Sequence, residues 1–385
     1  MHSQLLRLGL GISLLLPAVA RAQIGDSNLR MFGYFQTSYL HAKDAESDRV
    51  QKSFSMQQLN MFLQRDLGSK ATAFANFEVL NNFSSGKQWG SFSIEEAWLR
   101  WHFDPRLNLR VGLQTPTFNY LNDIKNRTPL LAYVIRPLVY ESSFNEIIRV
   151  EEYLPARAYI QAYGYIPKGV AKFDYAVYLG NSPNINSNQE YGQTGVDTTA
   201  SFLVGSRVGL RAGEFGLGVS ATYDRYDFPK EINSLIGEDK QKFLQVPRVR
   251  LGGDFRYSLR NFSLESEFIR VNYDENDSDL SVDLRFYYAT LFYEPISALK
   301  LYASYWYVKE EQFGFEEEIG LNGAYRSYYD VDYFFRAIGG GASLNLDDNI
   351  VIKLQAAPVR QEVETPTIHN ESDQYYFAMG LSVVL

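Results

Sequence analysis

The feature that most constrains this chain is an alternation of apolar and polar residues with a period of two, which returns along almost its whole length. It is clearest in the stretch FSIEEAWLRWHFDPRLNLRVGLQ, residues 92–114. The apolar row of this stretch contains Ala97, Leu99, Trp101, Phe103, Leu107, Leu109, Val111 and Leu113. Successive side chains of a strand point to opposite faces, so the pattern predicts strands. The short link Asp104-Pro105-Arg106 makes the two strands an antiparallel hairpin.

The same alternation predicts about 16 antiparallel strands and therefore an all-β chain. The expected strands cover residues 29–41, 54–65, 70–80, 92–103, 107–114, 156–166, 172–180, 201–212, 217–227, 245–259, 262–273, 282–293, 299–309, 333–346, 350–359 and 373–385. Their links are alternately tight turns and long polar stretches, and the long ones include residues 310–332 and 361–372. Short periplasmic turns with longer outer loops are typical of a bacterial outer-membrane barrel. We therefore expect a closed transmembrane β-barrel with both chain ends on the periplasmic side, because closure also removes sheet edges.

Two of these strands have a less regular pattern. The alternation in residues 262–273 changes phase near Ile269, which predicts a β-bulge. In residues 333–346 the pattern assigns no clear inner and outer face.

The first residues have the composition of a secretory signal. His2 and Arg7 lie in the n-region, residues 8–20 are apolar, and Ala20-Arg21-Ala22 is an A-x-A cleavage site. The apolar run is too short for a membrane-spanning helix, which disfavours an uncleaved anchor. We expect a signal peptide at residues 1–22, cleavage near Ala22, and an outer-membrane β-barrel at residues 23–385.

Composition narrows the class of protein further. The formal net charge is -8, and removal of a signal that holds two Arg and no acid leaves -10, which argues against a nucleic-acid partner. The chain contains no Cys, so it forms no disulfide or thiolate metal site. The 28 Tyr and 26 Phe suit a barrel whose outer face contacts membrane lipids between aromatic girdles.

Residues 55–141 carry a resemblance to a known family. The stretches that carry it are QLNMFLQRDLGSKATAFANFEV and SIEEAWLRWHFDPRLNLRVGLQTPTF. They resemble the phosphate-selective porin O/P superfamily of outer-membrane channels. The resemblance implies an outer-membrane porin for passive diffusion of small hydrophilic solutes or ions, commonly a homotrimer, whose long third outer loop folds inward. Family members commonly carry a basic pair where this chain has Gln57 and Gln58, and this chain is acidic, so the resemblance supports the porin architecture rather than phosphate specificity.

Residues 115–154 interrupt the alternation over about 40 positions, which exceeds an ordinary loop. Leu130, Leu131, Val134, Ile135, Leu138 and Val139 are too apolar for a freely solvated loop. We expect the stretch to fold into the barrel and narrow it; the alternatives are a cap outside the barrel or a contact with a neighbouring subunit. The charged residues expected at the constriction are Lys125, Arg127, Arg136, Glu141, Glu146, Arg149, Glu151 and Glu152.

Charged residues on the polar rows of the strands are expected to line the lumen, because a charge facing lipid is costly. By alternation they are Glu78, Glu96, Arg100, Arg110, Lys172, Asp174, Arg207, Arg211, Arg248, Arg250, Asp254 and Lys353. A wall of mixed sign orients dipolar solutes and tunes ion selectivity without specifying one substrate. A simply solvated wall is the alternative interpretation for each of these residues.

Other functions find less support in the sequence. The acidic residues 310–318 could bind a divalent cation, but their spacing fits no known calcium loop and favours a solvated loop. The aromatic run from Tyr302 to Tyr307 could stack on sugars, although such residues more often belong to interface girdles. No G-x-S-x-G or H-E-x-x-H motif is present, which disfavours a hydrolase. We expect no enzymatic activity, cofactor or metal; a structural or adhesive barrel stays open.

Overall fold

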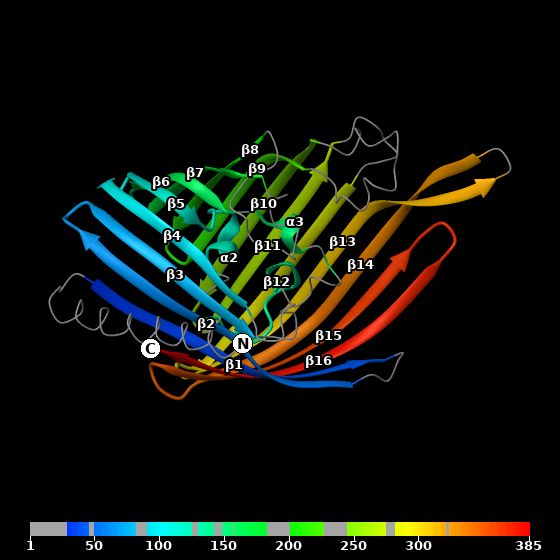
Figure 1. The fold of residues 1–385 in the computed structure, drawn as a ribbon. Helices are drawn as coiled ribbons and strands as arrows, with labels where there is room; N and C mark the ends of the chain where they lie inside the picture. Colours follow the sequence, from blue (N-terminus) through cyan, green and yellow to red (C-terminus); the bar gives the residue numbers. More distant parts are fainter. Residues whose placement is uncertain are drawn as a thin grey trace, which may run out of the picture.

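The computed structural model describes residues 29–45, 50–81, 91–124, 130–141, 148, 150–155, 157–182, 201–226, 245–274, 282–320 and 323–385. The signal peptide expected at residues 1–22 lies outside them. Sixteen antiparallel strands in this part of the chain form a closed barrel, in which each strand pairs with its sequence neighbours and β1 pairs with β16 (Figure 1). The predicted all-β class and the number of strands are confirmed.

The strand boundaries show how far each alternating stretch extends. They are β1 Leu29–Asp44, β2 Val50–Leu67, β3 Ala71–Asn81, β4 Ser91–Asp104, β5 Leu107–Gln114, β6 Ala158–Lys168, β7 Ala171–Asn181, β8 Phe202–Ala212, β9 Phe215–Tyr226, β10 Val246–Leu259, β11 Phe262–Tyr273, β12 Val282–Ile296, β13 Leu299–Gly320, β14 Gly323–Asn345, β15 Ile350–Glu364 and β16 His369–Val384. β13 and β14 run far beyond the expected strands, and they pair from Leu299 with Leu344 to Gly320 with Gly323. The prediction of a loop over residues 310–332 is therefore wrong. The link expected at residues 361–372 also shortens to residues 365–368.

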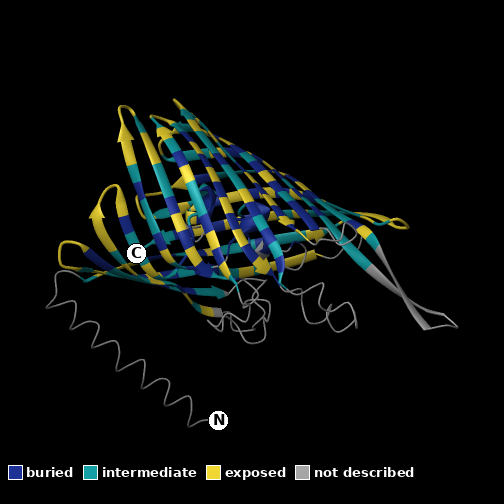
Figure 2. Cartoon of the chain, turned by 90° about the horizontal axis from the view of Figure 1, so that it is seen from above, coloured by how far each residue is buried: buried dark blue, intermediate teal, exposed yellow. Residues whose placement is uncertain are grey.

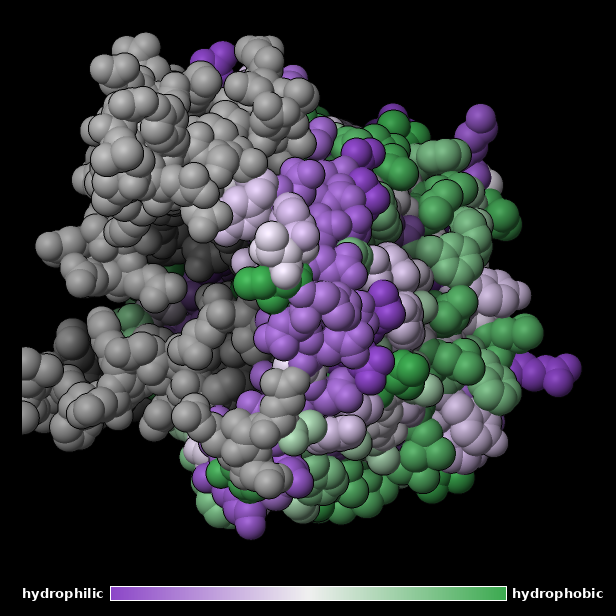
Figure 3. Space-filling model, turned by 90° about the vertical axis from the view of Figure 1, so that its right-hand side faces the viewer, coloured by the Kyte–Doolittle hydropathy of each residue, from purple (hydrophilic) through white to green (hydrophobic). Residues whose placement is uncertain are grey.

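Exposure alternates along the strands as the sequence pattern predicts (Figure 2). In β9 the residues at even positions from Gly216 to Tyr226 are buried, and those at odd positions from Leu217 to Arg225 are exposed. The outward row is apolar over much of the barrel, as for Val177 on β7 and Val219 on β9, which are 52% and 60% exposed. Figure 3 shows hydrophobic residues on the right of one face and hydrophilic residues in its middle. An apolar band next to polar margins matches an outer surface that contacts lipid.

The bulge predicted near Ile269 is wrong. β11 pairs without a break from Phe262 to Tyr273 with both β10 and β12. Its inward row changes from polar Glu265 and Glu267 to apolar Ile269 and Val271, and this change of chemistry produces the apparent change of phase. In β14 the sequence pattern assigned no inner and outer face. There the buried residues Phe335 and Ala337 alternate with the exposed residues Arg336 and Ile338.

Bulges do occur in β2 and β4. The β2–β3 register shifts between Met56 and Leu59, and Gln57 and Gln58 are both buried. The β3–β4 register shifts opposite Glu95, so that Glu95 and Glu96 are both shielded while Ile94 and Ala97 are exposed. Each bulge therefore brings two consecutive polar residues to the same side of the wall.

Residues 115–157, between β5 and β6, form what we call the inner segment. They contain α2 (Asn119–Ile124), the 3-10 turn η2 (Leu138–Tyr140) and α3 (Val150–Tyr153). α2 contacts β9 and β10, and α3 contacts β11 (Figure 1). Over the described residues, no helix has the length and apolar character needed to cross a membrane.

Candidate functional site

The inner segment packs its apolar side chains against inward-facing residues of the strands. Within this one cluster it contributes Phe118, Leu121, Val134, Ile135, Leu138, Val139, Tyr140, Ile148, Tyr153 and Leu154. The strands contribute inward-facing apolar residues, chiefly of β11 to β16, including Ile269, Val271, Leu284, Phe286, Trp306, Val308, Phe335 and Val359. Leu121 and Leu138 are 0% exposed. The apolar residues of the segment are therefore removed from water by the inner wall of the barrel, and this burial stabilises its position.

Hydrogen bonds fix the segment on the same wall. The backbone N–H groups of Val134 and Ile135 donate to Gln355 Oε1 of β15 at 2.9 and 2.8 Å. The phenols of Tyr133 and Tyr140 donate to Glu265 and Glu267 of β11. Burial and the adjacent carboxylate raise the pKa of each phenol well above its usual value, so both stay protonated donors.

Four buried charged residues form a cluster at α3. Asp224 of β9 accepts from Arg248 at 2.7 Å and from Arg250 at 3.2 Å, both on β10. Arg248 also donates to Glu152 of α3 at 2.9 Å, and Arg250 donates to the Glu152 carbonyl at 2.7 Å. The exposure of Arg248, Arg250 and Asp224 is 1% or less, so each charge depends on its partners rather than on water.

A second cluster spans four strands. Arg207 of β8 donates to Asp174 of β7 at 2.7 Å and to Asp254 of β10 at 2.8 Å. A Cβ atom at Gly218 on the intervening β9 would meet Arg207 and Asp254, so glycine is what leaves room for this guanidinium group. Arg211 shares Asp174 at 3.0 Å and is half exposed.

Three smaller pairs involve the segment or the neighbouring wall. Arg157, at the end of the inner segment, pairs with Glu95, while Gln58 donates to Glu78 at 2.5 Å. Arg136 pairs with Glu141 at 3.2 Å within the segment.

Several predicted lumen residues carry no ion pair with a described residue. Arg110 lies over the rings of Trp98 and Tyr163, with its guanidinium carbon 4.4 and 5.1 Å from the ring centres. Arg100, which pairs with Arg110 across β4 and β5, donates to Thr72 at 3.1 Å. Lys172 lies 5.7 Å from the centre of the Tyr165 ring.

The predicted lumen and constriction residues differ in where the structure places them. Glu78, Arg110, Arg207, Arg248, Arg250 and Lys353 are on the inner rows, and buried Lys353 donates to Gln36 at 2.9 Å. Glu96 accepts from the backbone N–H of Thr115 at 3.1 Å. Of the residues predicted at the constriction, the structure describes the surroundings of Arg136, Glu141 and Glu152; Lys125, Arg127, Glu146 and Arg149 and the side chain of Glu151 lie outside the described residues.

The sequence missed Glu95, Arg157 and Arg256. Phe92 and Ile94 alternate in the opposite phase from Ala97 and Leu99, so the pair Glu95-Glu96 was the signal of a bulge that turns both acids inward. Arg256 continues the row of Arg248, Arg250 and Asp254 and could have been found by alternation. Arg157 precedes its strand and gave no such signal.

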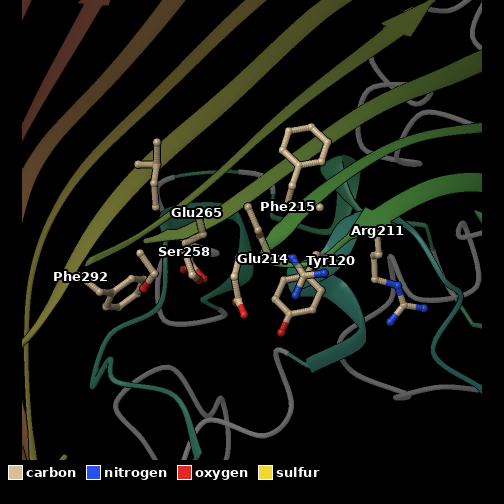
Figure 4. Close-up of a pocket in the computed structure, with 12 residues that line it drawn as sticks. Tyr120, Arg211, Glu214, Phe215, Ser258, Glu265 and Phe292 are labelled. Carbon is tan, nitrogen blue, oxygen red and sulfur yellow. The ribbon is translucent and has the colours of Figure 1, made fainter. Parts of the chain in front are cut away.

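A cavity of 340 Å³ lies next to α2 at the end of the barrel where the tight turns are (Figure 4). Its lining includes Tyr120, Arg211, Glu214, Arg256 and Glu265. The Arg256 guanidinium carbon lies 3.5 Å from the centre of the Tyr120 ring. The cavity therefore combines aromatic, acidic and basic groups beneath the inner segment.

The described residues contain no group of three or more His, Asp or Glu side chains arranged to hold a metal ion. In the predicted acidic cluster, Glu310 accepts from Tyr153 at 3.1 Å, and Glu311 pairs with Arg285 at 3.0 Å. The side chains of residues 316–318 lie outside the described residues.

A closed barrel with an apolar outer surface and a charged interior defines an outer-membrane channel. The chain belongs to the Gram-negative porins, because the family model of that description matches residues 11–336. No curated protein matches it.

Solved structures share the fold at low sequence identity. The anion-selective porin from Comamonas acidovorans is 11% identical with a TM-score of 0.61, and the match covers 94% of this chain and 100% of that one. OprB of Pseudomonas putida is 9% identical with a TM-score of 0.57, covering 95% and 96%. The outer membrane channel DcaP of Acinetobacter baumannii is 10% identical with a TM-score of 0.56, covering 93% and 97%. The family and the fold confirm the prediction of an outer-membrane porin for passive diffusion.

Proposed function

We propose that small hydrophilic solutes and ions cross beside the inner wall of β3 to β8, and that the inner segment narrows this path. The observation that supports the proposal is the difference between the two sides of the lumen. On β11 to β16 the inner rows carry apolar residues that pack against the segment, such as Ile269, Phe286 and Trp306. On β3 to β8 the inner row carries Arg100, Arg110 and Arg207, which are partly exposed, and Lys172 and Arg211, which are exposed. A wall of accessible polar groups replaces part of the hydration of a passing ion.

The constriction is proposed where the segment brings charges to this path. Lys125, Arg127, Arg136, Glu141, Glu146, Arg149, Glu151 and Glu152 are its candidate charged residues. Arg136 and Glu141 pair with each other, and Glu152 is tied to Arg248, so these three contribute to holding the segment in place. The selectivity of the narrowest point then depends on whichever candidate charges stay accessible to ions.

We propose passage without a chemical step or a cofactor. Membership of the porin family supports this proposal. Two of the His residues that would serve as bases have other partners: His102 hydrogen-bonds Asn108 at 2.7 Å, and His369 lies beside Glu364 and Glu371. A serine nucleophile needs a base within hydrogen-bond reach.

Purified protein in a planar lipid bilayer tests the channel directly. We expect stepwise single-channel conductance, because the lumen is lined by polar groups on one side. A folded protein, shown by heat-modifiable migration in detergent, that never conducts would instead support the structural or adhesive alternative.

Native mass on the same sample tests two further proposals, a chain that begins at Gln23 and a homotrimer formed through outward residues such as Trp101, which is 44% exposed. A mass of one chain would remove the trimer, and a mass that includes residues 1–22 would remove the cleavage.

Single cysteines test the orientation of the barrel, since the chain has none of its own. Val170, in the tight turn after β6, is 91% exposed, and Thr367, in the link between β15 and β16, is also exposed. A membrane-impermeant maleimide should label Thr367→Cys on intact cells and Val170→Cys only after permeabilisation, because Val170 lies at the end of the barrel that holds both chain ends, expected on the periplasmic side, and Thr367 lies at the opposite end. Labelling in the opposite order would invert the topology.

A further inference from the structure

Several cations of the described lumen have no ion-pair partner among the described residues, although the chain as a whole is acidic. The formal net charge is -8. The inward acids, however, are engaged by protein donors, and several inward cations are not engaged by acids. This difference matters because an ion in the lumen interacts most with charges that the protein has not already neutralised.

The acids have their partners close by. Asp174 and Asp254 share Arg207, and Asp224 lies between Arg248 and Arg250. Among the glutamates, Glu95 pairs with Arg157, and the others accept hydrogen bonds from uncharged groups: Glu78 from Gln58, Glu96 from the Thr115 backbone, Glu265 from Tyr133 and Glu267 from Tyr140 and the Leu121 backbone. The ion pairs offset the charge of their carboxylates. The hydrogen bonds from uncharged groups leave the charge but direct the carboxylate oxygens toward the protein, and Glu78 and Glu267 are buried away from a passing cation.

Three cations of the same lumen lie on aromatic rings instead. Arg110 lies over Trp98 and Tyr163, Arg256 lies over Tyr120, and Lys172 lies over Tyr165. None of them forms an ion pair with a described residue. A ring face holds a cation in place by its quadrupole and leaves the net positive charge intact.

The geometry of Arg110 suits the binding of an anion. A guanidinium group donates its hydrogen bonds in its own plane, so rings that contact its faces leave the donors at its edge available. Arg100 is the direct cross-strand neighbour of Arg110 and donates to the neutral Thr72 hydroxyl. Two like charges side by side repel each other, and an anion between them relieves that repulsion.

A stack of rings supports Trp98 from the side away from Arg110. Phe74 lies 4.7 Å from Trp98 at an interplanar angle of 22°, and Phe62 lies 5.6 Å from Phe74 at 27°. Phe32 continues the stack at 5.0 Å from Phe62. These rings stand on the inner rows of β1 to β4, where a porin wall that only needed to be wet would carry polar side chains.

We propose that this channel prefers anions, and that Arg110 and Arg100 form the site where the carboxylate or phosphate oxygens of a passing solute bind. Trp98 is a positioning residue that holds Arg110 without neutralising it. Lys172 extends the positive wall toward the tight-turn end. Arg256, whose ring partner Tyr120 lines the cavity between Arg211 and Glu214, has the acid Glu265 as its cross-strand neighbour and so contributes less to that wall (Figure 4). This inference rests on the proposed function, since it requires that the lumen conducts.

Reversal potentials in a potassium chloride gradient test the preference. Wild-type protein should be more permeable to chloride than to potassium. The double variant Arg100→Gln/Arg110→Gln should lower the chloride-to-potassium permeability ratio at least about fivefold, the effect of one unit charge at about 4 Å in water. Arg270→Gln, which removes an outward, partly exposed charge from β11, is the matched control and should leave the ratio unchanged. Heat-modifiable migration of each variant establishes that it is folded.

Block of the chloride current by added citrate or tripolyphosphate tests the binding site. Both anions should block wild type, and the double variant should need at least about fivefold more of either anion for the same block. Trp98→Leu keeps both arginines but frees Arg110, so it should weaken block by both anions. Absence of any conductance would contradict the proposed function. Conduction with a cation preference, or with a ratio that Arg100→Gln/Arg110→Gln does not lower, would overturn the anion site alone.

Discussion

Deletion of Pro129 to Ser143 is expected to raise the single-channel conductance by roughly twofold or more, because it removes the part of the inner segment that we propose narrows the lumen. The barrel should still close, since the sixteen strands pair with one another and not with the segment. Glu265 and Glu267 lose the phenols of Tyr133 and Tyr140 and become accessible to water. Planar-bilayer recordings on folded, heat-modifiable protein measure the effect.

A second variant separates the volume of the segment from its hydrogen bonds. Tyr133→Phe/Tyr140→Phe removes two hydroxyl groups and keeps the chain, so its mean conductance should stay near wild type while its current becomes noisier. If the folded deletion variant conducts like wild type, the inner segment does not limit the path and the proposed constriction is wrong.

Asp224→Ala should lower the free energy of unfolding by about 3–5 kcal/mol, the usual cost of leaving a buried charge without its partner. Asp224 is 0% exposed and stands between Arg248 and Arg250, whose guanidinium groups have no access to water that could replace it. Arg248 would retain Glu152 at 2.9 Å, whereas Arg250 would retain only the Glu152 carbonyl. Guanidinium-induced unfolding in detergent, followed by tryptophan fluorescence, measures the change.

Glu294→Ala is the matched control for this measurement. Glu294 pairs with Lys300 at 2.8 Å, but both side chains are at least 40% exposed. Such a pair contributes about 0–1 kcal/mol, so its loss should be small. Equal destabilisation by the two substitutions would show that the buried cluster is held together by something other than its charges.

The period of two predicted the barrel because lipid on one side and water on the other sort side chains by chemistry. The predictions of a bulge at Ile269 and of a loop at residues 310–332 were wrong, because the sequence there does not show an apolar outer row facing a polar inner row. Around Ile269 the inner wall is covered by apolar groups of the inner segment instead of water, so the inward residues Ile269 and Val271 are apolar. The outward residues Arg270 and Asn272 beside them are polar, so the pattern looks shifted. In residues 310–332 polar residues fall on both rows, so the sequence pattern gave no sign of the backbone pairing by which β13 and β14 continue there.

The site was less accessible to sequence reasoning than the fold. Alternation put Arg110, Arg207, Arg248 and Arg250 on the inner rows, where the structure has them. Their partners could not be derived, because the contacts join distant positions: Arg248 and Glu152 are 96 residues apart, and Gln355 and Val134 are 221 apart. Which charges are neutralised and which stay accessible depends on those contacts.

The packed inner wall also has a consequence for how the chain reaches its folded state. In β12, Phe286 and Tyr288 point into the barrel, and Tyr287 and Leu291, which are 39% and 49% exposed, point out of it. Before insertion this strand has no face that water solvates well, and an apolar strand with unpaired edges is prone to aggregate. Lipid can shield only its outer side. Membrane insertion alone therefore leaves the inner side of β12 exposed to water. The tendency of this strand to self-associate ends only when the inner segment has docked against it.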